Sequence, residues 1–313
     1  MILAVDGGNS KTDVVLVGTD GALLGHARGP LSSPHHLGLD ASVELLTGLV
    51  AEAGLDGQRA AVAQVLLAGV DFPEEERTLY AALEPRAWAE RLHVGNDTFA
   101  LLRAGTERGW GIAVVCGAGI NCVGVAPDGR HVRYPALGTI TGDWGGGYDV
   151  GLAAIWAAAR SEDGRGPKTP LERLVPEHFD VDTPLELAYA IHTGRIEQRR
   201  AVELAPLVLA LAADDPVADE IVARLAAEVV ALVRATAARL ALSGMDVVLG
   251  GGVMRGATSR LLEAIGAGLD DLDLKLVRTN APPIVGAALL ALDELDVTDD
   301  VRARARREIE EAF

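Results

Sequence analysis

The stretch Asp6-Gly7-Gly8-Asn9-Ser10-Lys11-Thr12-Asp13 lies between two short apolar segments. A Walker-type phosphate loop would place Gly four residues before Gly-Lys-Ser/Thr and would lead into a helix. Ser10-Lys11-Thr12 lacks that spacing, and residues 12–17 form a β-branched run that ends at the turn Gly18-Thr19-Asp20-Gly21. The loop therefore joins two strands. Its glycines, small polar side chains and Lys11 suit either an anion-binding loop or an ordinary tight hairpin turn.

The composition is typical of a packed α/β protein. The chain has 313 residues, of which 49% are hydrophobic, and it contains 36 glycines. This length is sufficient for two domains of ordinary size. The formal charge is 28 minus 45, or −17, so no surplus of basic side chains exists to bind nucleic acid or an anionic membrane.

Neither the start of the sequence nor its apolar runs indicate a targeting or membrane segment. Met1 leads directly into the apolar segment 2–5, with no charged leader or cleavage site. No uninterrupted apolar run approaches membrane-spanning length. Cys116 and Cys122 are too few for a disulfide framework or a cysteine-rich zinc site, and we expect them to be small buried residues. We therefore expect a cytoplasmic protein.

Apolar periodicity predicts one series of strands and helices followed by a second. Strands are expected at 2–5, 13–17, 22–27, 65–68 and 92–94, with helices at 39–53 and 74–83 and a short helix after Asp97. After a boundary at 105–110, strands are expected at 111–115 and 121–125, helices at 201–211 and 217–242, and strands at 247–249 and 274–277 separated by a helix. A charged helix is expected at 301–313. The two halves thus share one pattern.

The second half repeats the Gly-rich hairpin. Cys116-Gly117-Ala118-Gly119-Ile120-Asn121 stands where the first half has Asp6-Gly7-Gly8-Asn9. Two strand-turn-strand loops at matching positions could face each other across a cleft and hold a polyphosphate from both sides. The repetition therefore favours anion binding by both loops over two ordinary turns.

A carboxylate ends the apolar strand in His93-Val94-Gly95-Asn96-Asp97-Thr98. Ligands of α/β sheets usually bind at the carboxyl ends of strands, which favours Asp97 as a general base. A helix is expected directly after Asp97, so a helix-capping role is the alternative.

Two further small-residue segments occur late in the chain. Leu249-Gly250-Gly251-Gly252 ends a strand and precedes a helix, so its backbone could pass close to a nucleoside. It does not match the dinucleotide fingerprint, because the third required glycine is missing. Ile284-Val285-Gly286-Ala287-Ala288 begins an apolar helix whose small residues permit close helix packing.

Five segments resemble, in their order, the phosphate 1, connect 1, phosphate 2, adenosine and connect 2 motifs of the sugar kinase, heat-shock protein 70 and actin superfamily. These segments are residues 6–12, 94–97, 116–121, 249–252 and 284–288. Within this superfamily the chain resembles the BadF/BadG/BcrA/BcrD-type ATPase family, and especially its N-acetylglucosamine kinases. Gly117-Ala118-Gly119-Ile120-Asn121-Cys122 is similar to their Gly-Thr-Gly-Ser-Asn-Cys loop, and residues 142–148 are similar to their Gly-Asp-Glu-Gly-Ser-Ala-Tyr segment.

The resemblance implies an α/β, two-domain actin-like ATPase fold of the ribonuclease H-like type with an interdomain nucleotide cleft. The expected domains are 1–105 and 106–291, with the terminal helix in 292–313 packing back on the first. Asp97 would be the catalytic base, and Asp6 would contact magnesium through water. The residues implied to bind the phosphates of ATP are Gly7, Gly8, Asn9, Ser10, Lys11, Thr12, Gly117, Ala118, Gly119, Ile120 and Asn121, and those implied to border the adenosine are Gly250, Gly251 and Gly252.

The sugar site departs from the family pattern. The resemblance implies sugar contacts from Asn96, Asp97, Gly142 and Asp143, with Ser33 and His35 as replacements for a missing upstream asparagine. For Asp143 the alternative is an N-cap, and for His35 and His36 it is an exposed loop pair. Ala118 replaces a family threonine and Trp144 an acidic residue.

The resemblance implies an ATP- and Mg²⁺-dependent kinase that phosphorylates the 6-hydroxyl of N-acetylglucosamine. Glucosamine or N-acetylmuramic acid is the alternative substrate, and an ATPase activator of a 2-hydroxyacyl-CoA dehydratase is the alternative function. The activators hold an iron-sulfur cluster through cysteines, and Cys116 and Cys122 do not have the positions of such ligands. The sequence leaves open whether the protein is a homodimer.

Overall fold

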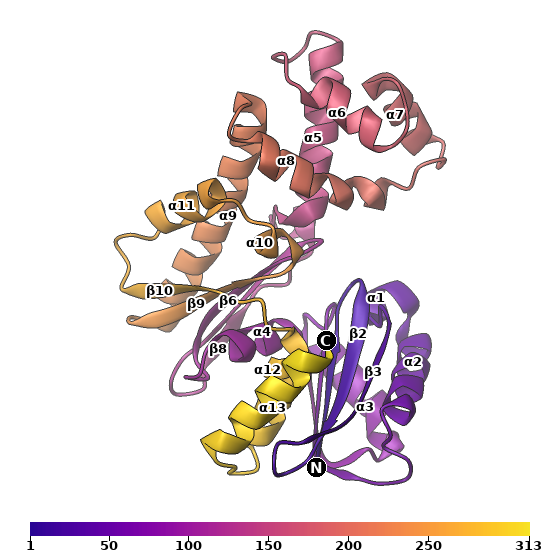
Figure 1. The fold of residues 1–313 in the computed structure, drawn as a ribbon, viewed down its shortest axis with the longest axis vertical. Coiled ribbons are helices and arrows are strands. Elements are labelled where there is room, and N and C mark those ends of the chain that lie inside the picture. Colours follow the sequence, from indigo (N-terminus) through magenta and orange to yellow (C-terminus); the bar gives the residue numbers. More distant parts are fainter. The chain divides into compact units, whose positions relative to one another are not determined.

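A meander of three strands continues into two parallel strands in the first sheet of the computed structural model, which describes residues 1–313 (Figure 1). The strands are β1 (Ile2–Gly7), β2 (Lys11–Val17), β3 (Leu23–Pro30), β4 (Ala60–Leu67) and β5 (Ala89–Asn96). Their order is β3-β2-β1-β4-β5. The pairs β1/β2 and β2/β3 are antiparallel, whereas β1/β4 and β4/β5 are parallel. The carboxyl ends of β1, β4 and β5 therefore lie at one edge.

The second sheet repeats this arrangement. Its strands are β6 (Gly111–Cys116), β7 (Ile120–Val125), β8 (His131–Arg133), β9 (Met245–Gly250) and β10 (Leu274–Arg278), in the order β10-β9-β6-β7-β8. Read from the meander edge, the first sheet runs β3-β2-β1-β4-β5 and the second β8-β7-β6-β9-β10. The repeat expected from the sequence is thus present in the strand order, and the α/β fold class is confirmed.

The remaining elements are helices. In the first half they are α1 (Pro34–Leu37), α2 (Leu39–Glu52), α3 (Pro73–Leu83), the 3-10 turn η1 (Glu84–Arg86) and α4 (Thr98–Gly105). Those that follow are η2 (Gly138–Ile140), α5 (Gly146–Glu162), α6 (Leu171–His178), α7 (Pro184–His192), η3 (Gln198–Leu204), α8 (Ala205–Leu211), α9 (Pro216–Leu240), α10 (Gly252–Arg255), α11 (Ser259–Ala267), α12 (Pro283–Asp293) and α13 (Asp299–Ala312). The expected helix at 201–211 is a 3-10 turn followed by α8. No helix is long and apolar enough to cross a membrane.

The chain divides into two compact units. The first contains residues 1–113, 123–135 and 279–313, and the second contains 114–122 and 136–278. Helix α12 thus belongs to the first unit, whereas the sequence-based boundary assigned residues 283–291 to the second domain. The physical reason is close packing, because a Cβ on Gly286 would lie 1.8 Å from the carbonyl oxygen of Ala100 on α4. A glycine at this position allows the two helices to approach.

Both faces of the three central strands β1, β2 and β4 are covered, which explains why these strands are nearly continuously apolar. Alternate residues such as Leu3 and Val5 belong to one buried cluster with Leu46 of α2. Ile2 and Ala4 point to the opposite face, in a cluster formed mainly with α12 and α13. Burial on both faces removes the polar alternation of a half-exposed sheet.

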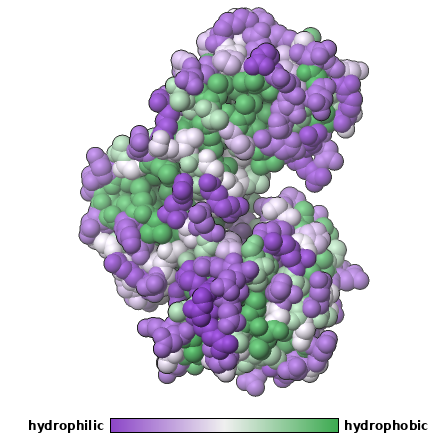
Figure 2. Space-filling view, in the orientation of Figure 1, coloured by the Kyte–Doolittle hydropathy of each residue, from purple (hydrophilic) through white to green (hydrophobic).

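Helix α13 packs back on the first unit. Glu308 accepts a hydrogen bond from the amide of Leu23 at 2.8 Å, and Arg304 binds Asp20 at 2.9 Å. Its outer side is charged, and Figure 2 shows a hydrophilic surface over this helix.

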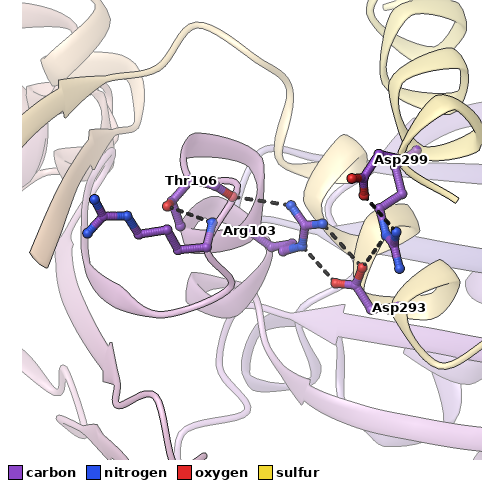
Figure 3. A network of polar contacts seen from close by, with 6 residues as sticks. Arg103, Thr106, Asp293 and Asp299 are labelled. Atoms are coloured by element: carbon purple, nitrogen blue, oxygen red, sulfur yellow. Dashed lines mark hydrogen bonds and ion pairs between the residues drawn. The ribbon is translucent and has the colours of Figure 1, made fainter. Parts of the chain in front are cut away.

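A polar network fixes the end of α4 to α12 and α13 (Figure 3). The buried Arg103 donates from Nε to Asp293 at 2.7 Å and from Nη1 to the carbonyl of Thr106 at 3.2 Å. Arg302 of α13 binds the same carboxylate at 2.8 Å and binds Asp299 at 3.0 Å. Helix α4 is therefore held at its carboxyl end, while its amino end follows Asp97.

Candidate active site

Asp97 follows β5 and occupies the N-cap position of α4, but its side chain makes no capping hydrogen bond. Asn96 performs this function instead. Its Oδ1 accepts hydrogen bonds from the amide of Thr98 at 3.0 Å and from the Thr98 hydroxyl at 2.6 Å. The capping alternative for Asp97 therefore has no support, and its carboxylate is available for chemistry.

Asp97 is half-buried, and its surroundings disfavour the charged form. Burial and the nearby carboxylate of Asp71 raise the pKa of Asp97 to about 7, although the amides of Asp97 and Thr98 act in the opposite direction. A carboxyl group with this pKa can accept a proton at neutral pH and release it again.

Asp6, at the carboxyl end of β1, lies in the same charged environment. It is 7% exposed. Burial raises the pKa of Asp6 well above its usual range, and the carboxylates of Asp97 and Asp13 add to the effect, which Lys11 partly offsets. A cation bound nearby would relieve this repulsion and favour ionised Asp6.

Lys11 is held by a buried carboxylate. Asp13 is fully buried and accepts hydrogen bonds from Lys11 Nζ at 2.5 Å and from Arg28 Nε at 2.6 Å. Asp13 pairs with Asp6 in the register of β1 and β2. The ammonium group therefore lies beside the first hairpin, directed toward Asp13.

The two glycines of the first hairpin differ in environment. A Cβ on Gly7 would lie 2.3 Å from Ser32 Oγ and 2.4 Å from Leu67 Cδ2, so two buried side chains would have to move and packing favours glycine there. A Cβ on Gly8 would meet only the carbonyl of Lys11 at 3.6 Å. The amide of Gly8 donates to that carbonyl at 2.9 Å, closing the turn, while Asn9 and Ser10 are exposed at its tip. Thr12 is buried; its hydroxyl donates to the carbonyl of Pro30 and forms a hydroxyl–hydroxyl hydrogen bond with Ser32, each at 2.7 Å.

The structure adds Asp71, which the sequence analysis missed. Asp71 lies in the turn after β4, and its Oδ1 accepts a hydrogen bond from Asn96 Nδ2 at 2.9 Å. Both polar groups of the Asn96 side chain are thus engaged, so Asn96 connects Asp71 to the start of α4. Asp97 was indicated by its position after the carboxyl end of a parallel strand. Asp71 has the same kind of position after β4, so the same rule would have indicated it.

Ser33 and His35 pack against the same turn. A Cβ on Gly69, whose φ is +77°, would lie 2.7 Å from Ser33 Oγ and 3.2 Å from the His35 ring. Ser33 is 1% exposed and its hydroxyl has no hydrogen-bond partner. His35 Nε2 lies 2.7 Å from Glu75 Oε1. Both His35 and His36 are exposed on the short helix α1, but His35 is held by its contact with Glu75.

The second Gly-rich loop is held by the start of α5. The amides of Gly147 and Tyr148 donate to the carbonyls of Gly117 and Ala118 at 2.8 and 2.9 Å. Cβ atoms on Gly117 and Gly119 would meet nothing within 4 Å, and neither residue has a positive φ. Protein packing therefore gives no reason for glycine at these two positions.

The other residues of this loop differ in exposure, and Ala118 is exposed. The side chain of Ile120 is buried. Asn121 Oδ1 accepts a hydrogen bond from the amide of Cys122 at 2.7 Å. Burial raises the pKa of both Cys116 and Cys122 to about 12, so both remain thiols.

The late glycine cluster adjoins the second loop within the second unit. A Cβ on Gly251, whose φ is +94°, would lie 2.4 Å from the carbonyl oxygen of Cys116. Gly250 ends β9, and Gly252 faces open space except for Arg255 Nη2 at 3.9 Å. Only Gly252 thus presents an open backbone surface.

Gly142 and Asp143 lie between η2 and α5 in the second unit. Gly142 has a φ of +83° and faces open space. Asp143 is half-buried and accepts a hydrogen bond from the Thr141 hydroxyl. Gly145 is the N-cap of α5, and its amide donates to Asp149, so Asp143 is not the capping residue. The Arg224 guanidinium lies 4.0 Å from the centre of the Trp144 ring.

The structure thus gathers the expected residues in two sets. The first unit contains Asp6, the first hairpin, Ser33, His35, Asn96 and Asp97. The second unit contains the second loop, Gly142, Asp143 and the late glycine cluster. No group of three or more His, Cys, Asp or Glu side chains is arranged to hold a metal ion.

Duplicated sheets of this order, each with a Gly-rich hairpin, define the class of actin-like ATPase folds. The chain belongs to the BadF/BadG/BcrA/BcrD ATPase family, whose model matches residues 3–291.

Named relatives agree with this assignment. An N-acetylmuramic acid/N-acetylglucosamine kinase of Clostridium acetobutylicum is 29% identical over 260 residues, covering 81% of this chain and 85% of the relative. An N-acetyl-D-glucosamine kinase of Dictyostelium discoideum is 26% identical over 315 residues, covering 94% and 98%. The crystal structure of a Chromobacterium violaceum protein, provisionally named an N-acetylglucosamine kinase, is 27% identical with a TM-score of 0.71, covering 93% and 98%. A ROK family glucokinase of Streptomyces griseus shares the fold at 16% identity, with a TM-score of 0.56 and coverage of 93% and 99%.

Proposed function

We propose that this protein is an ATP-dependent amino-sugar kinase that transfers the γ-phosphate of ATP to the 6-hydroxyl of N-acetylglucosamine. The observation that carries the proposal is the Asp97 carboxylate. It directly follows strand β5 and makes no side-chain capping bond, and burial together with Asp71 raises its pKa to about 7. The names of the two kinases related at 29% and 26% identity support the sugar class.

Asp97 acts as the general base. Its carboxylate accepts the proton of the sugar hydroxyl as the hydroxyl oxygen bonds to the γ-phosphorus. The bond from that phosphorus to the β,γ-bridging oxygen breaks, and ADP leaves with the electron pair. General base catalysis contributes about 10² to 10⁴ in rate, and the rest comes from positioning and charge stabilisation.

Backbone groups of the two hairpins bind the phosphates. In the second loop the carbonyls of Gly117 and Ala118 are occupied by α5, and Gly117 and Gly119 leave open space for an anion. In the first hairpin Gly8, Asn9 and Ser10 form the accessible tip. The amides of Gly8 and Gly117 are engaged within their own turns, at the carbonyls of Lys11 and Gly119, so the open glycine surfaces let phosphate oxygens approach the other amides of the two loops.

Magnesium fits the first unit through Asp6. Mg²⁺ is usually bound by one or two carboxylates together with water and substrate phosphates, so no three-ligand cluster is required. The raised pKa of Asp6 indicates a site whose ionised form gains from a cation. When bound, magnesium neutralises phosphate charge as the transferred group moves.

Asp143 and Asp97 supply carboxylate acceptors for sugar hydroxyls, with Gly142 leaving space beside Asp143. Glucosamine and N-acetylmuramic acid remain the alternative substrates. The iron-sulfur activator role is disfavoured, because a cluster held between two subunits requires cysteines at the surface, and Cys116 and Cys122 are both buried. Location in the cytoplasm and assembly into a dimer stay predictions.

The decisive experiment is ADP release with a panel of sugars. N-acetylglucosamine, glucosamine, N-acetylmuramic acid and glucose are each supplied with ATP and Mg²⁺. We expect the highest kcat/KM for N-acetylglucosamine, because a site that desolvates polar groups rejects analogues without the matching groups. If glucosamine is at least about tenfold better, the kinase stands but the substrate is wrong. Absence of sugar-dependent ADP release would overturn the kinase assignment.

A further inference from the structure

Glu75, on the first turn of α3, connects two segments that are distant in the sequence. Its Oε1 lies 2.7 Å from His35 Nε2, 40 residues away. Its Oε2 accepts hydrogen bonds from the amides of Asp71 at 2.7 Å and Phe72 at 2.9 Å. One carboxylate thus joins His35 to the turn 69–72 that carries Asp71.

The contacts continue from this turn to the base. Asp71 binds Asn96 at 2.9 Å, and the charge of Asp71 acts on Asp97. The carbonyl of Val70 accepts a hydrogen bond from Arg133 at 3.2 Å, and Arg133 also binds Glu76 at 2.6 Å. The turn is therefore held on both sides next to Asp97.

The contact with Glu75 also fixes which nitrogen of a neutral His35 ring carries the hydrogen. A carboxylate accepts only, so Nε2 must carry the hydrogen in this pair. In the neutral ring Nδ1 is then an acceptor. No hydrogen bond engages Nδ1, and it lies 3.4 Å from the position that a Cβ on Gly69 would occupy. The His35 side chain is 41% exposed.

We propose that Glu75 is a positioning residue for sugar recognition, which fixes His35 beside the Asp71 turn with Nδ1 presented as a hydrogen-bond acceptor. This inference rests on the proposed amino-sugar kinase function. The ligand group that it selects is a hydrogen-bond donor of the sugar, a hydroxyl or an amide N–H. A carboxylate-bearing substituent at this point would meet an acceptor and the Glu75 charge, so it would be rejected.

An alternative role for Glu75 is purely structural, because it occupies position N3 of α3 and accepts from the N-cap amide of Phe72. Glu75→Gln separates the two roles. Its amide oxygen can still accept from the amides of Asp71 and Phe72, and its NH₂ group then faces His35. The ring must now accept at Nε2, which makes Nδ1 a donor.

The experiment compares wild-type protein with Glu75→Gln and with Glu74→Gln as the matched control. Glu74 is adjacent on α3, exposed and paired only with Arg77. The KM values for N-acetylglucosamine and ATP, the melting temperature, and the His35 tautomer by ¹⁵N NMR are measured for all three. We expect Glu75→Gln to invert the tautomer and to raise the sugar KM about tenfold or more, with ATP KM and melting temperature nearly unchanged. Glu74→Gln should match wild type.

An unchanged sugar KM in Glu75→Gln with an inverted tautomer would overturn the proposal, as would an unchanged tautomer or an equal rise in the KM for ATP. These results leave the kinase function intact, because wild-type turnover is measured in the same series. A wild-type protein that neither binds nor phosphorylates an amino sugar would overturn both proposals.

Discussion

At the scale of single residues, Asp97 combines a catalytic position with an unfavourable environment. Its folded-state pKa of about 7 lies above the usual value of 3.8. Ionising it therefore costs the folded protein stability: the group is harmless below its unfolded pKa, and the cost grows as the pH rises toward 7. A site that keeps such a group gives up stability for activity.

Asp97→Asn tests whether the Asp97 carboxylate lowers the stability of the folded protein while it supports catalysis. Turnover should fall by about 10² or more because proton acceptance is lost, while ATP affinity persists. The melting temperature should rise relative to wild type at pH 8 and by less at pH 5. In the wild type, kcat/KM should increase with pH through about 7, the pKa of Asp97. Turnover close to wild type, or a variant less stable at pH 8, would contradict the assignment.

Asp71 controls where that pH dependence lies. Asp71→Asn removes a neighbouring negative charge, so the pKa of Asp97 should fall and the acidic limb of kcat/KM should move to lower pH. A loss of packing alone would lower the rate at every pH without moving the limb. A pH profile of the folded variant measured with saturating ATP distinguishes these outcomes.

Ser33 provides a second residue-level test. A buried hydroxyl without a partner costs about 1–3 kcal/mol, so Ser33→Ala should leave the free protein equally stable or more stable. If the sugar supplies the missing partner, its KM should rise. Ser42→Ala is the control, because Ser42 donates to the carbonyl of Gly38 at 2.9 Å. That variant should lose some stability and retain the KM. A Ser33→Ala variant with unchanged KM would exclude Ser33 from the sugar site.

At the scale of elements, the two hairpins could be located from the sequence because turn chemistry and strand periodicity are local. The contacts that support the hairpins could not be located in this way, because they come from distant segments of the chain. The amides of α5 bind the second loop over a separation of about 30 residues, and Gly251, the residue after β9, packs on Cys116. The same limit applies to Asn96, whose capping of α4 depends on rotamers and not on residue type. Asp71 was within reach of the strand-end rule, but the expected strand ended three residues before it.

The second loop can be tested through its glycines. Gly117→Val adds a side chain in open space, so the melting temperature of the free protein should change little, whereas ATP affinity should fall strongly. Gly48→Val is a control for valine in open space elsewhere in the chain, although valine also lowers helix propensity slightly there. Gly251→Ala should damage folding itself, because its Cβ would lie 2.4 Å from a carbonyl oxygen. Normal nucleotide affinity in folded Gly117→Val would show that the loop is only a turn.

At the scale of the whole molecule, the first unit is assembled from the beginning, middle and end of the chain. Local periodicity predicted α12 and α13, but the assignment of α12 to this unit depends on contacts with α4 that no local pattern reveals. The polar network of Arg103, Asp293 and Arg302 joins these segments (Figure 3). Helix α4, which begins after Asp97, therefore depends on the carboxyl-terminal part of the chain.

The two charged partners of this network differ in exposure. Arg103 is 8% exposed on its side chain and Asp293 is 34% exposed. Asp293→Leu leaves the buried guanidinium with only the Thr106 carbonyl, so it should cost about 3 kcal/mol or more. Arg103→Leu leaves Asp293 paired with Arg302 and should cost less, and the double variant should recover part of the loss, because no buried charge remains. Urea unfolding monitored in the first unit gives these free energies. A smaller cost for Asp293→Leu than for Arg103→Leu would show that the buried arginine does not depend on this carboxylate.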